Sequence, residues 1–368
     1  MDWMRLKFSN IARLFILSFL SRRKLLLLSV IAGFAGCSSD SDISQLPWVT
    51  DTQWNASDVP TQLEIQFHGA ASGVIRFGDE GIVMDPFVSN NPLIDVMSFA
   101  PLRPDPKLVK AAFPDLSFIK GVVVGHGHYD HLLDAPEIAK RLPESAKVYL
   151  SKTSFNQISS AIAKEKIEIV NGRLNKPYDE SLWYELTDSN IRIYPVRSEH
   201  SPHILSYQLA SGEIKHPLTD MPTHALDWKN GINVNFAIQF AGVNSSNGED
   251  QSYSLYVQSS SSNAPIGLPP EGMVEALGNF DVLILCAANY DSVDNYPEAL
   301  LEATKPSHVI IIHWDNFFQP RNFDEPNLIP GLDLADLLAR IKAVDAEIKV
   351  SIPMPDGIVK ISKYTQSI

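Results

Sequence analysis

The chain has 368 residues, 45% of them hydrophobic and 20% charged, which is enough for one large domain or two small ones. Its formal net charge is −13 at pH 7, and removing residues 1–36, which hold six basic residues and one acidic residue, takes it to −18. A surface this acidic repels phosphate backbones, so nucleic acid is excluded as an expected partner.

The first 36 residues have the pattern of a secretory signal peptide. Basic residues 22–24 precede an apolar run, residues 25–34, that is too short for a comfortable membrane span. The next three residues, Ala35-Gly36-Cys37, resemble a bacterial lipobox, in which Cys37 is lipidated and becomes the mature N-terminus. We therefore expect an exported lipoprotein, anchored to a membrane of the bacterial cell envelope and facing the periplasm.

Three alternatives remain open for this segment. Residues 21–26, Ser-Arg-Arg-Lys-Leu-Leu, also resemble a twin-arginine export signal, so the sequence does not decide the export route. An uncleaved membrane anchor would leave the domain in the same compartment. The unusually long stretch before Ser21 also allows translation to start after Met1.

Only one further cysteine follows. Cys286 has no disulfide partner if Cys37 is lipidated, and it lies in the apolar run 281–287, so we expect a small core residue. Residues 37–60 are rich in Ser, Asp and Pro and predict a tether between lipid and domain. The remaining residues, 61–368, form the predicted catalytic domain.

The domain opens with three predicted strands, residues 63–67, 73–77 and 81–86, which alternate or are β-branched and are separated by Gly turns. Residues 87–118 contain five prolines and little periodicity, which predicts a loop. The apolar run 121–125 is then typical of a buried strand.

Four metal-capable side chains follow that strand directly: His126, His128, Asp130 and His131. In an extended segment, residues two apart point the same way, so His126 and His128 are placed to bind one ion. Asp130 and His131 are placed to serve a neighbouring ion. Imidazole and carboxylate without thiolate suit a catalytic zinc or a similar first-row metal. The alternative is a polar loop whose histidines cap the next helix.

The pattern His126-x-His128-x-Asp130-His131 after an apolar strand resembles the metal-binding motif of the metallo-β-lactamase superfamily of hydrolases. This resemblance implies an α/β fold, an αββα sandwich with its ligands in loops at one edge of two sheets. Residues 67–72 and 84–86 are similar to the opening of the branch that holds the ascorbate-phosphate lactonases and the N-acyl-phosphatidylethanolamine phospholipase D enzymes. The same resemblance makes Asp85 a support for the ligand loop, whereas His68 is given no metal role.

The rest of the chain alternates predicted strands and helices. Strand 191–196 ends shortly before His200, which the resemblance makes the third ligand of the first site. For His203 the alternatives are substrate contact and no role, and no role is preferred. The other predicted elements are helix 134–142, strand 148–150, helix 154–164, strand 167–170, strand 252–258, helix 296–304, strand 308–312 and helix 332–344.

Two strand ends complete the expected site. Ser259 follows strand 252–258 at the position where two-metal relatives carry a bridging Asp, so it is a possible substitute there. His313 follows strand 308–312 and matches the last ligand of the family. Without a bridging carboxylate, a second ion is expected to bind more weakly.

The resemblance thus implies one site of His126, His128 and His200 and a second of Asp130, His131 and His313. The cofactor is one or two zinc ions or other first-row divalent metals, and metal-bound hydroxide attacks a phosphodiester, ester, lactone or amide bond of a small-molecule or lipid-like substrate. Asp130 is the expected catalytic base if the second site is empty. The alternatives are a metal-binding lipoprotein without turnover and an iron redox enzyme on the same ligands.

Overall fold

A computed structural model describes residues 43–52, 59–98, 100–203, 207–244 and 250–363. The predicted signal peptide, residues 1–36, and the predicted lipidation site, Cys37, lie outside these ranges and stay predictions. Within the described ranges, no helix combines the length and the apolar character that a bilayer span requires.

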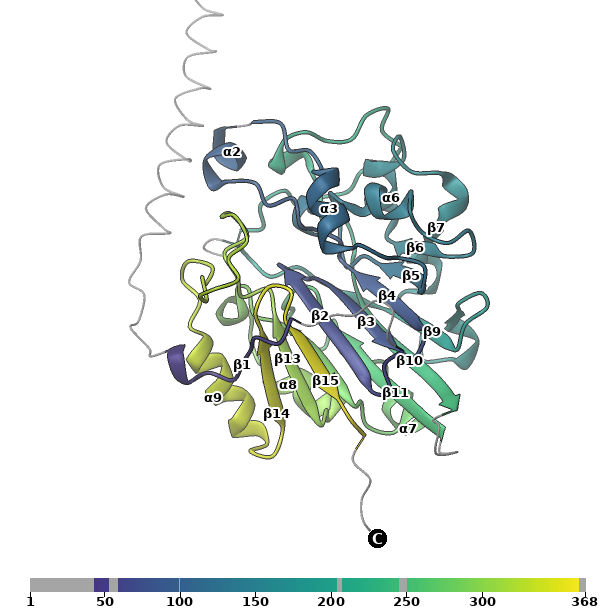
Figure 1. The fold of residues 1–368 in the computed structure, drawn as a ribbon, viewed down its shortest axis with the longest axis vertical. Coiled ribbons are helices and arrows are strands. Elements are labelled where there is room, and N and C mark those ends of the chain that lie inside the picture. The colour runs from purple at the N-terminus through teal and green to yellow at the C-terminus, as the bar shows by residue number, and fades with distance from the viewer. Residues whose placement is uncertain (1–42, 53–58, 99, 204–206, 245–249, 364–368) are drawn as a thin grey trace, which may run out of the picture. The chain divides into compact units, whose positions relative to one another are not determined.

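Two mixed β-sheets form the centre of the domain (Figure 1). The first has seven strands within the described residues; β15, β2, β3 and β4 pair antiparallel, and β4 to β7 pair parallel. Its order is β15 (Ile358–Ile361), β2 (Leu63–Gly69), β3 (Ser72–Phe77), β4 (Glu80–Met84), β5 (Ile119–Val123), β6 (Lys147–Leu150) and β7 (Ile167–Ile169).

The second sheet has eight strands within the described residues. Neighbouring strands among β1, β14, β13, β12 and β11 pair parallel. Neighbouring strands among β11, β10, β9 and β8 pair antiparallel. The order is β1 (Trp48–Val49), β14 (Lys349–Pro353), β13 (His308–Ile312), β12 (Val282–Cys286), β11 (Asp250–Val257), β10 (Asn233–Asn244), β9 (Ile191–Ser198) and β8 (Tyr184–Glu185).

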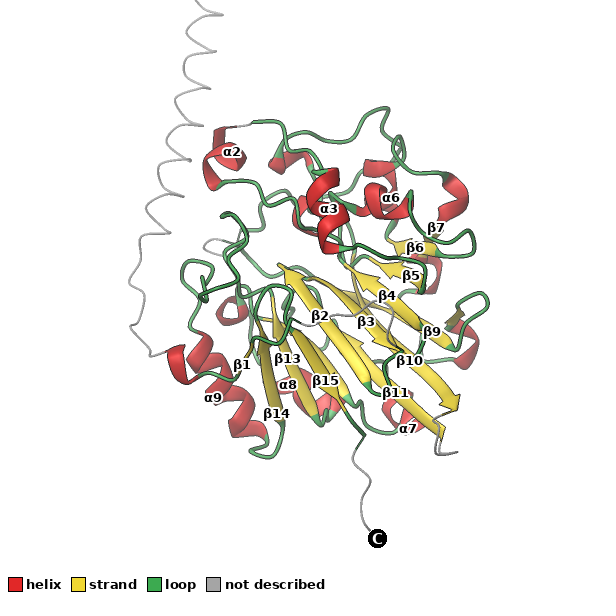
Figure 2. Cartoon of the chain, in the orientation of Figure 1, coloured by secondary structure: helices red, strands yellow, loops and turns green. Residues whose placement is uncertain are grey.

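Helices cover the outer faces of both sheets (Figure 2). Val109, Ile138 and Ile158 of α3, α5 and α6 share one apolar core with strands of the seven-stranded sheet. Leu300 of α8 and Leu337 of α9 belong to the larger core, which also fills the space between the sheets. The α/β sandwich of two sheets is therefore confirmed. The α-helices are α2 (Leu93–Ser98), α3 (Pro106–Ala112), α4 (Tyr129–Leu132), α5 (Ala135–Ala139), α6 (Lys152–Ile158), α7 (Met273–Leu277), α8 (Glu298–Thr304) and α9 (Leu334–Val344).

Most predicted elements form within a few residues of the expected bounds. The helix expected over residues 332–344 is α9, whose Leu334, Leu337 and Ile341 are buried and whose Asp333 side chain accepts from the Asp336 N–H. Apolar spacing of three and four residues thus located the packing face correctly.

Other expectations differ from the structure. Residues 43–52 lie in the predicted tether, yet β1 pairs with β14, and the Trp48 ring packs 4.8 Å from that of Trp314, so this part belongs to the domain. Residues 87–118 contain α2 and α3 rather than a loop throughout. The helix predicted over residues 154–164 is α6, which begins earlier because Ser151 caps it. Strand β10 was not predicted.

The two sheets meet closely at Gly125, just after β5. A Cβ atom there would lie 2.3 Å from the Ser259 Oγ, which follows β11 in the other sheet, and 2.5 Å from its Cβ. The Gly125 carbonyl also accepts from the Val234 N–H of β10 at 2.7 Å. Glycine is therefore required here for the close approach of two chain segments.

We expect Gly125→Ala to lower the free energy of unfolding by about 1–3 kcal/mol, because the added methyl overpacks a buried contact. In a domain of this size that corresponds to a melting temperature several degrees lower, measured by calorimetry. Gly172→Ala is the control, because its Cβ would meet no atom within 4 Å. Equal melting temperatures for the two variants would contradict this packing.

Candidate metal centre

Residues that follow strands of both sheets place polar side chains at one edge of the sandwich. In the seven-stranded sheet β2, β4 and β5 run in one direction, so the residues after them, including Asp85 and His126, share an edge. In the other sheet β9, β11 and β13 also run in one direction, and His200, Ser259 and His313 follow their carboxyl ends. Sites of α/β folds commonly form at this edge.

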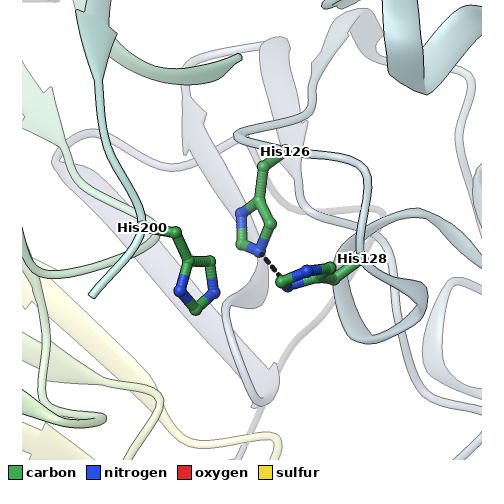
Figure 3. A group of neighbouring side chains, drawn as sticks. All are labelled: His126, His128 and His200. Atoms are coloured by element: carbon green, nitrogen blue, oxygen red, sulfur yellow. Dashed lines mark hydrogen bonds between the residues drawn. The ribbon is translucent and has the colours of Figure 1, made fainter. Parts of the chain in front are cut away.

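Three histidines form the first group (Figure 3). The ring centroids of His126, His128 and His200 lie 4.7 Å from one another in each pair, with the rings steeply inclined. The Nε2 of His126 is 3.1 Å from the Nδ1 of His128. The Nδ1–H of His200 donates to the Ser201 carbonyl at 2.7 Å, which leaves its Nε2 lone pair free for the group.

A carboxylate and two histidines form the second group. The Asp130 Oδ2 lies 3.4 Å from the Nε2 of His131 and 3.5 Å from the Nε2 of His313. The two Nε2 atoms are 3.3 Å apart. Asp130 and His131 lie in α4, which His128 precedes directly, so one short segment contributes to both groups. The rings of His126 and His131 are 3.9 Å apart, and the groups are therefore adjacent.

The surroundings keep the first group neutral. Burial, followed by the charges of neighbouring histidines, lowers the pKa of His126 and of His200 well below its usual value. Burial also lowers the pKa of His128 to about 3, although Asp130 acts in the opposite direction. Neutral imidazoles offer a lone pair, which is the form that binds a metal ion.

The second group is charged. Burial alone would raise the pKa of Asp130, but His131 and His313 outweigh it and hold that pKa well below its usual range. Burial likewise lowers the pKa of His131, but the carboxylates of Asp130 and Asp85 outweigh it and raise the pKa to about 10. Asp130 is thus an ionised carboxylate, ready to act as an anionic ligand, whereas the His131 ring must lose a proton before it can bind a metal ion.

The donor sets fit metal ions. Two ligands at about 2.0–2.1 Å from a tetrahedral zinc lie about 3.4 Å apart, close to the spacing in the second group. Buried ring nitrogens without a hydrogen-bond partner among the described residues include His126 Nδ1, His128 Nε2 and His313 Nδ1. Burying so many polar groups is costly unless they are paired or bind a metal. Each set has three ligands, which leaves a position for substrate.

Asp85 supports both groups from the end of β4. Its Oδ1 accepts from the Gly125 N–H at 2.6 Å, next to His126, and its Oδ2 lies 3.5 Å from the His131 Nδ1. Ser259 donates its hydroxyl to the same Oδ2. The structure therefore places Asp85 where the ligand-supporting role was expected. It also gives Ser259 a contact with Asp85, while the bridging substitute role of Ser259 stays a prediction.

The loop that carries His126 and His128 is fixed on its other side by groups that the sequence did not indicate. The buried Gln157 side chain donates to the Gly127 carbonyl at 2.8 Å and accepts from the Lys229 N–H. The Gly127 N–H donates to the Asn230 carbonyl at 2.9 Å. These contacts join residues far apart in sequence, and no local sequence pattern predicts them.

The structure also locates the other polar residues considered. His68 is outside both groups; it is buried, and its Nδ1 lies 2.7 Å from the Asp356 Oδ1. Cys286 is buried in β12, as predicted, and burial raises the pKa of its thiol to about 12. His203 lies outside both groups, and its ring stacks on that of His200 with centroids 4.5 Å apart.

Sequence comparisons give partial relatives. No family model matches the chain. A UPF0173 metal-dependent hydrolase from Methylacidiphilum infernorum is 32% identical over 79 residues, which is 22% of this chain and 28% of the relative. One from Flavobacterium johnsoniae is 30% identical over 102 residues, which is 26% of this chain and 38% of the relative. The chain thus spans well under half the length of these curated relatives.

Solved structures match over most of the chain at low identity. Igni18, a metallo hydrolase from Ignicoccus hospitalis, matches at 16% identity and a TM-score of 0.47 over 83% of this chain and 100% of its own. The metallo-β-lactamase fold protein YhfI from Bacillus subtilis matches at 10% identity and a TM-score of 0.43, over 81% and 99%. The chain has an α/β fold of two mixed sheets, and stretches of its sequence are similar to UPF0173 metal-dependent hydrolases.

Proposed function

We propose that the protein is a metal-dependent hydrolase with one ion in each group. The observation that carries this proposal is the pair of adjacent three-ligand sets, His126, His128 and His200 beside Asp130, His131 and His313, each with its ligand atoms within 4.8 Å of one another. The curated relatives, which are described as metal-dependent hydrolases, support the same reaction class.

Metal ions held by the two three-residue sets would supply Lewis acidity, which lowers the pKa of a bound water to about 7. The protein's own side chains fix the geometry. Asp85 and the Ser201 carbonyl orient the rings of His131 and His200, so that each presents Nε2 to its group. When only the three-histidine group is filled, Asp130 is free to accept the proton of the attacking water.

The substrate class is proposed from the first strands. The segment 67–72 and Asp85 support the lactonase and phospholipase-D-like branch, so the bond cleaved is a phosphodiester, ester, lactone or amide in a small or lipid-like molecule. Zinc is the proposed metal because histidine and carboxylate ligands in sets of three suit it. An iron redox enzyme on the same ligands is the rival, and elemental analysis distinguishes the two.

We expect the zinc-loaded chain to hydrolyse at least one of three probes: bis(4-nitrophenyl) phosphate, 4-nitrophenyl acetate or a γ-lactone. Asp130→Asn should lower kcat/KM by about 100-fold or more, because it removes the anionic ligand of the second group, or the proton acceptor where only the three-histidine group is filled. Asp220→Asn, which changes an exposed carboxylate, should leave the rate unchanged. Full activity of Asp130→Asn, or of wild type after chelation, would contradict the proposal.

We also propose that the chain is exported and anchored through lipidated Cys37, on the periplasmic side of a bacterial membrane. The basic, apolar and small-residue pattern of residues 22–37 supports this. In cells, Cys37→Ser should move the protein from the membrane fraction to the soluble fraction, because a lipid chain supplies the membrane affinity. Cys286→Ser, which changes the other cysteine, should leave the membrane fraction unchanged. Retention of Cys37→Ser on membranes would refute lipid anchoring at this residue.

A further inference from the structure

His203 lies beside the metal groups without belonging to either. Its ring stacks on the ring of His200, with centroids 4.5 Å apart and planes inclined by 19°. The ring of His128 is 5.6 Å away. Both of these ring contacts are with the three-histidine group, and His203 is partly buried there.

A backbone contact fixes the tautomer of His203. The Leu209 N–H donates to its Nδ1 at 3.1 Å. An N–H can donate only to a nitrogen that carries no hydrogen, so the proton of the neutral ring is on Nε2. Within the part of the chain that the structure describes, the hydrogen bond of the His203 side chain involves Nδ1 and not Nε2.

The two stacked rings are therefore opposite tautomers, with the hydrogen on Nδ1 in His200 and on Nε2 in His203. His200 donates through Nδ1 to the Ser201 carbonyl and presents a lone pair at Nε2. His203 accepts at Nδ1 and presents a hydrogen at Nε2. The first arrangement suits a metal ligand, whereas the second suits a hydrogen-bond donor.

The segment after His203 holds this arrangement in place. The His203 N–H donates to the Tyr207 carbonyl at 2.9 Å, and the Gln208 side chain donates to the His200 carbonyl. Leu209 then donates to the His203 ring. Three consecutive residues thus fix two histidines, and the position of the Nε2–H is set by backbone contacts.

We propose that the His203 Nε2–H donates a hydrogen bond to an oxyanion of the substrate, the carbonyl or phosphoryl oxygen that gains charge, beside the three-histidine group. This rests on the proposed hydrolase function, and it makes His203 a catalytic residue. A preorganised donor beside metal ions stabilises developing negative charge. It also selects substrates with an anionic or strongly polarised oxygen.

Inorganic phosphate serves as the oxyanion probe. We would measure its affinity for the zinc-loaded full chain by titration calorimetry in wild type, His203→Ala, His203→Gln and His216→Ala, with zinc content determined for each. His203→Ala should bind phosphate about ten- to a hundred-fold more weakly, as the loss of a hydrogen bond to a charged group predicts. His203→Gln should restore most of the affinity, because its amide carries a donor at similar reach. His216→Ala, an exposed histidine, should match wild type.

Zinc content separates this inference from the proposed function. Equal zinc in all four proteins, with phosphate affinity lost in His203→Ala and regained in His203→Gln, is the expected result. Unchanged phosphate affinity in His203→Ala, no phosphate binding in wild type, or loss of zinc from His203→Ala would each overturn the donor role alone. Wild type without zinc would overturn the proposed function and this inference together.

Discussion

The carboxylate of Asp85 connects the parts on which the site depends. One oxygen holds the Gly125 N–H in the seven-stranded sheet, and the other accepts from Ser259, which follows β11 in the opposite sheet. The second oxygen also lies 3.5 Å from the His131 ring. A single buried anion thus fixes the start of the ligand loop, the distance between the sheets and the orientation of one ligand. Buried carboxylates of this kind are stabilised only when their hydrogen-bonding capacity is used.

The same constraint explains why glycine flanks His126 on both sides. A Cβ at Gly125 would meet Ser259, and one at Gly127 would lie 2.3 Å from the Lys229 carbonyl. The loop is therefore enclosed by two chain segments that adjoin β11 and β10 of the eight-stranded sheet. This close packing allows three imidazoles to converge without relying on the ions alone to collect them.

The local parts of the site were predictable from sequence. His126 to His131 follow a β-branched strand, and His313 follows another, so periodicity placed these side chains at strand ends. The roles of His200 and His313 as further ligands came from the resemblance rather than from spacing. Strand β1 was not predicted, because this short strand is packed through one large ring, that of Trp48, and shows no repeating hydrophobic pattern in the sequence.

Long-range contacts were the parts that sequence could not give. Gln157 and Asn230 act through contacts with segments far apart in sequence, and the Leu209 N–H contacts a ring six residues away. His203 is instructive, because one hydrogen bond from the backbone decides whether its ring offers a lone pair or a hydrogen. The role of Asp134 depends on long-range hydrogen bonds. It directly precedes α5, but its carboxylate accepts from the N–H groups of Val88 and Ser89 and does not cap the helix.

The two groups differ in charge, with three neutral imidazoles in one and an ionised carboxylate in the other. The measurement that tests the central claim most directly is the metal content of the full chain, by elemental analysis under metal-replete conditions, for wild type, His128→Ala and His313→Ala. The account predicts about two divalent ions per chain in wild type and about one in each variant. A wild-type chain without metal, or a metal content that neither substitution changes, would contradict it.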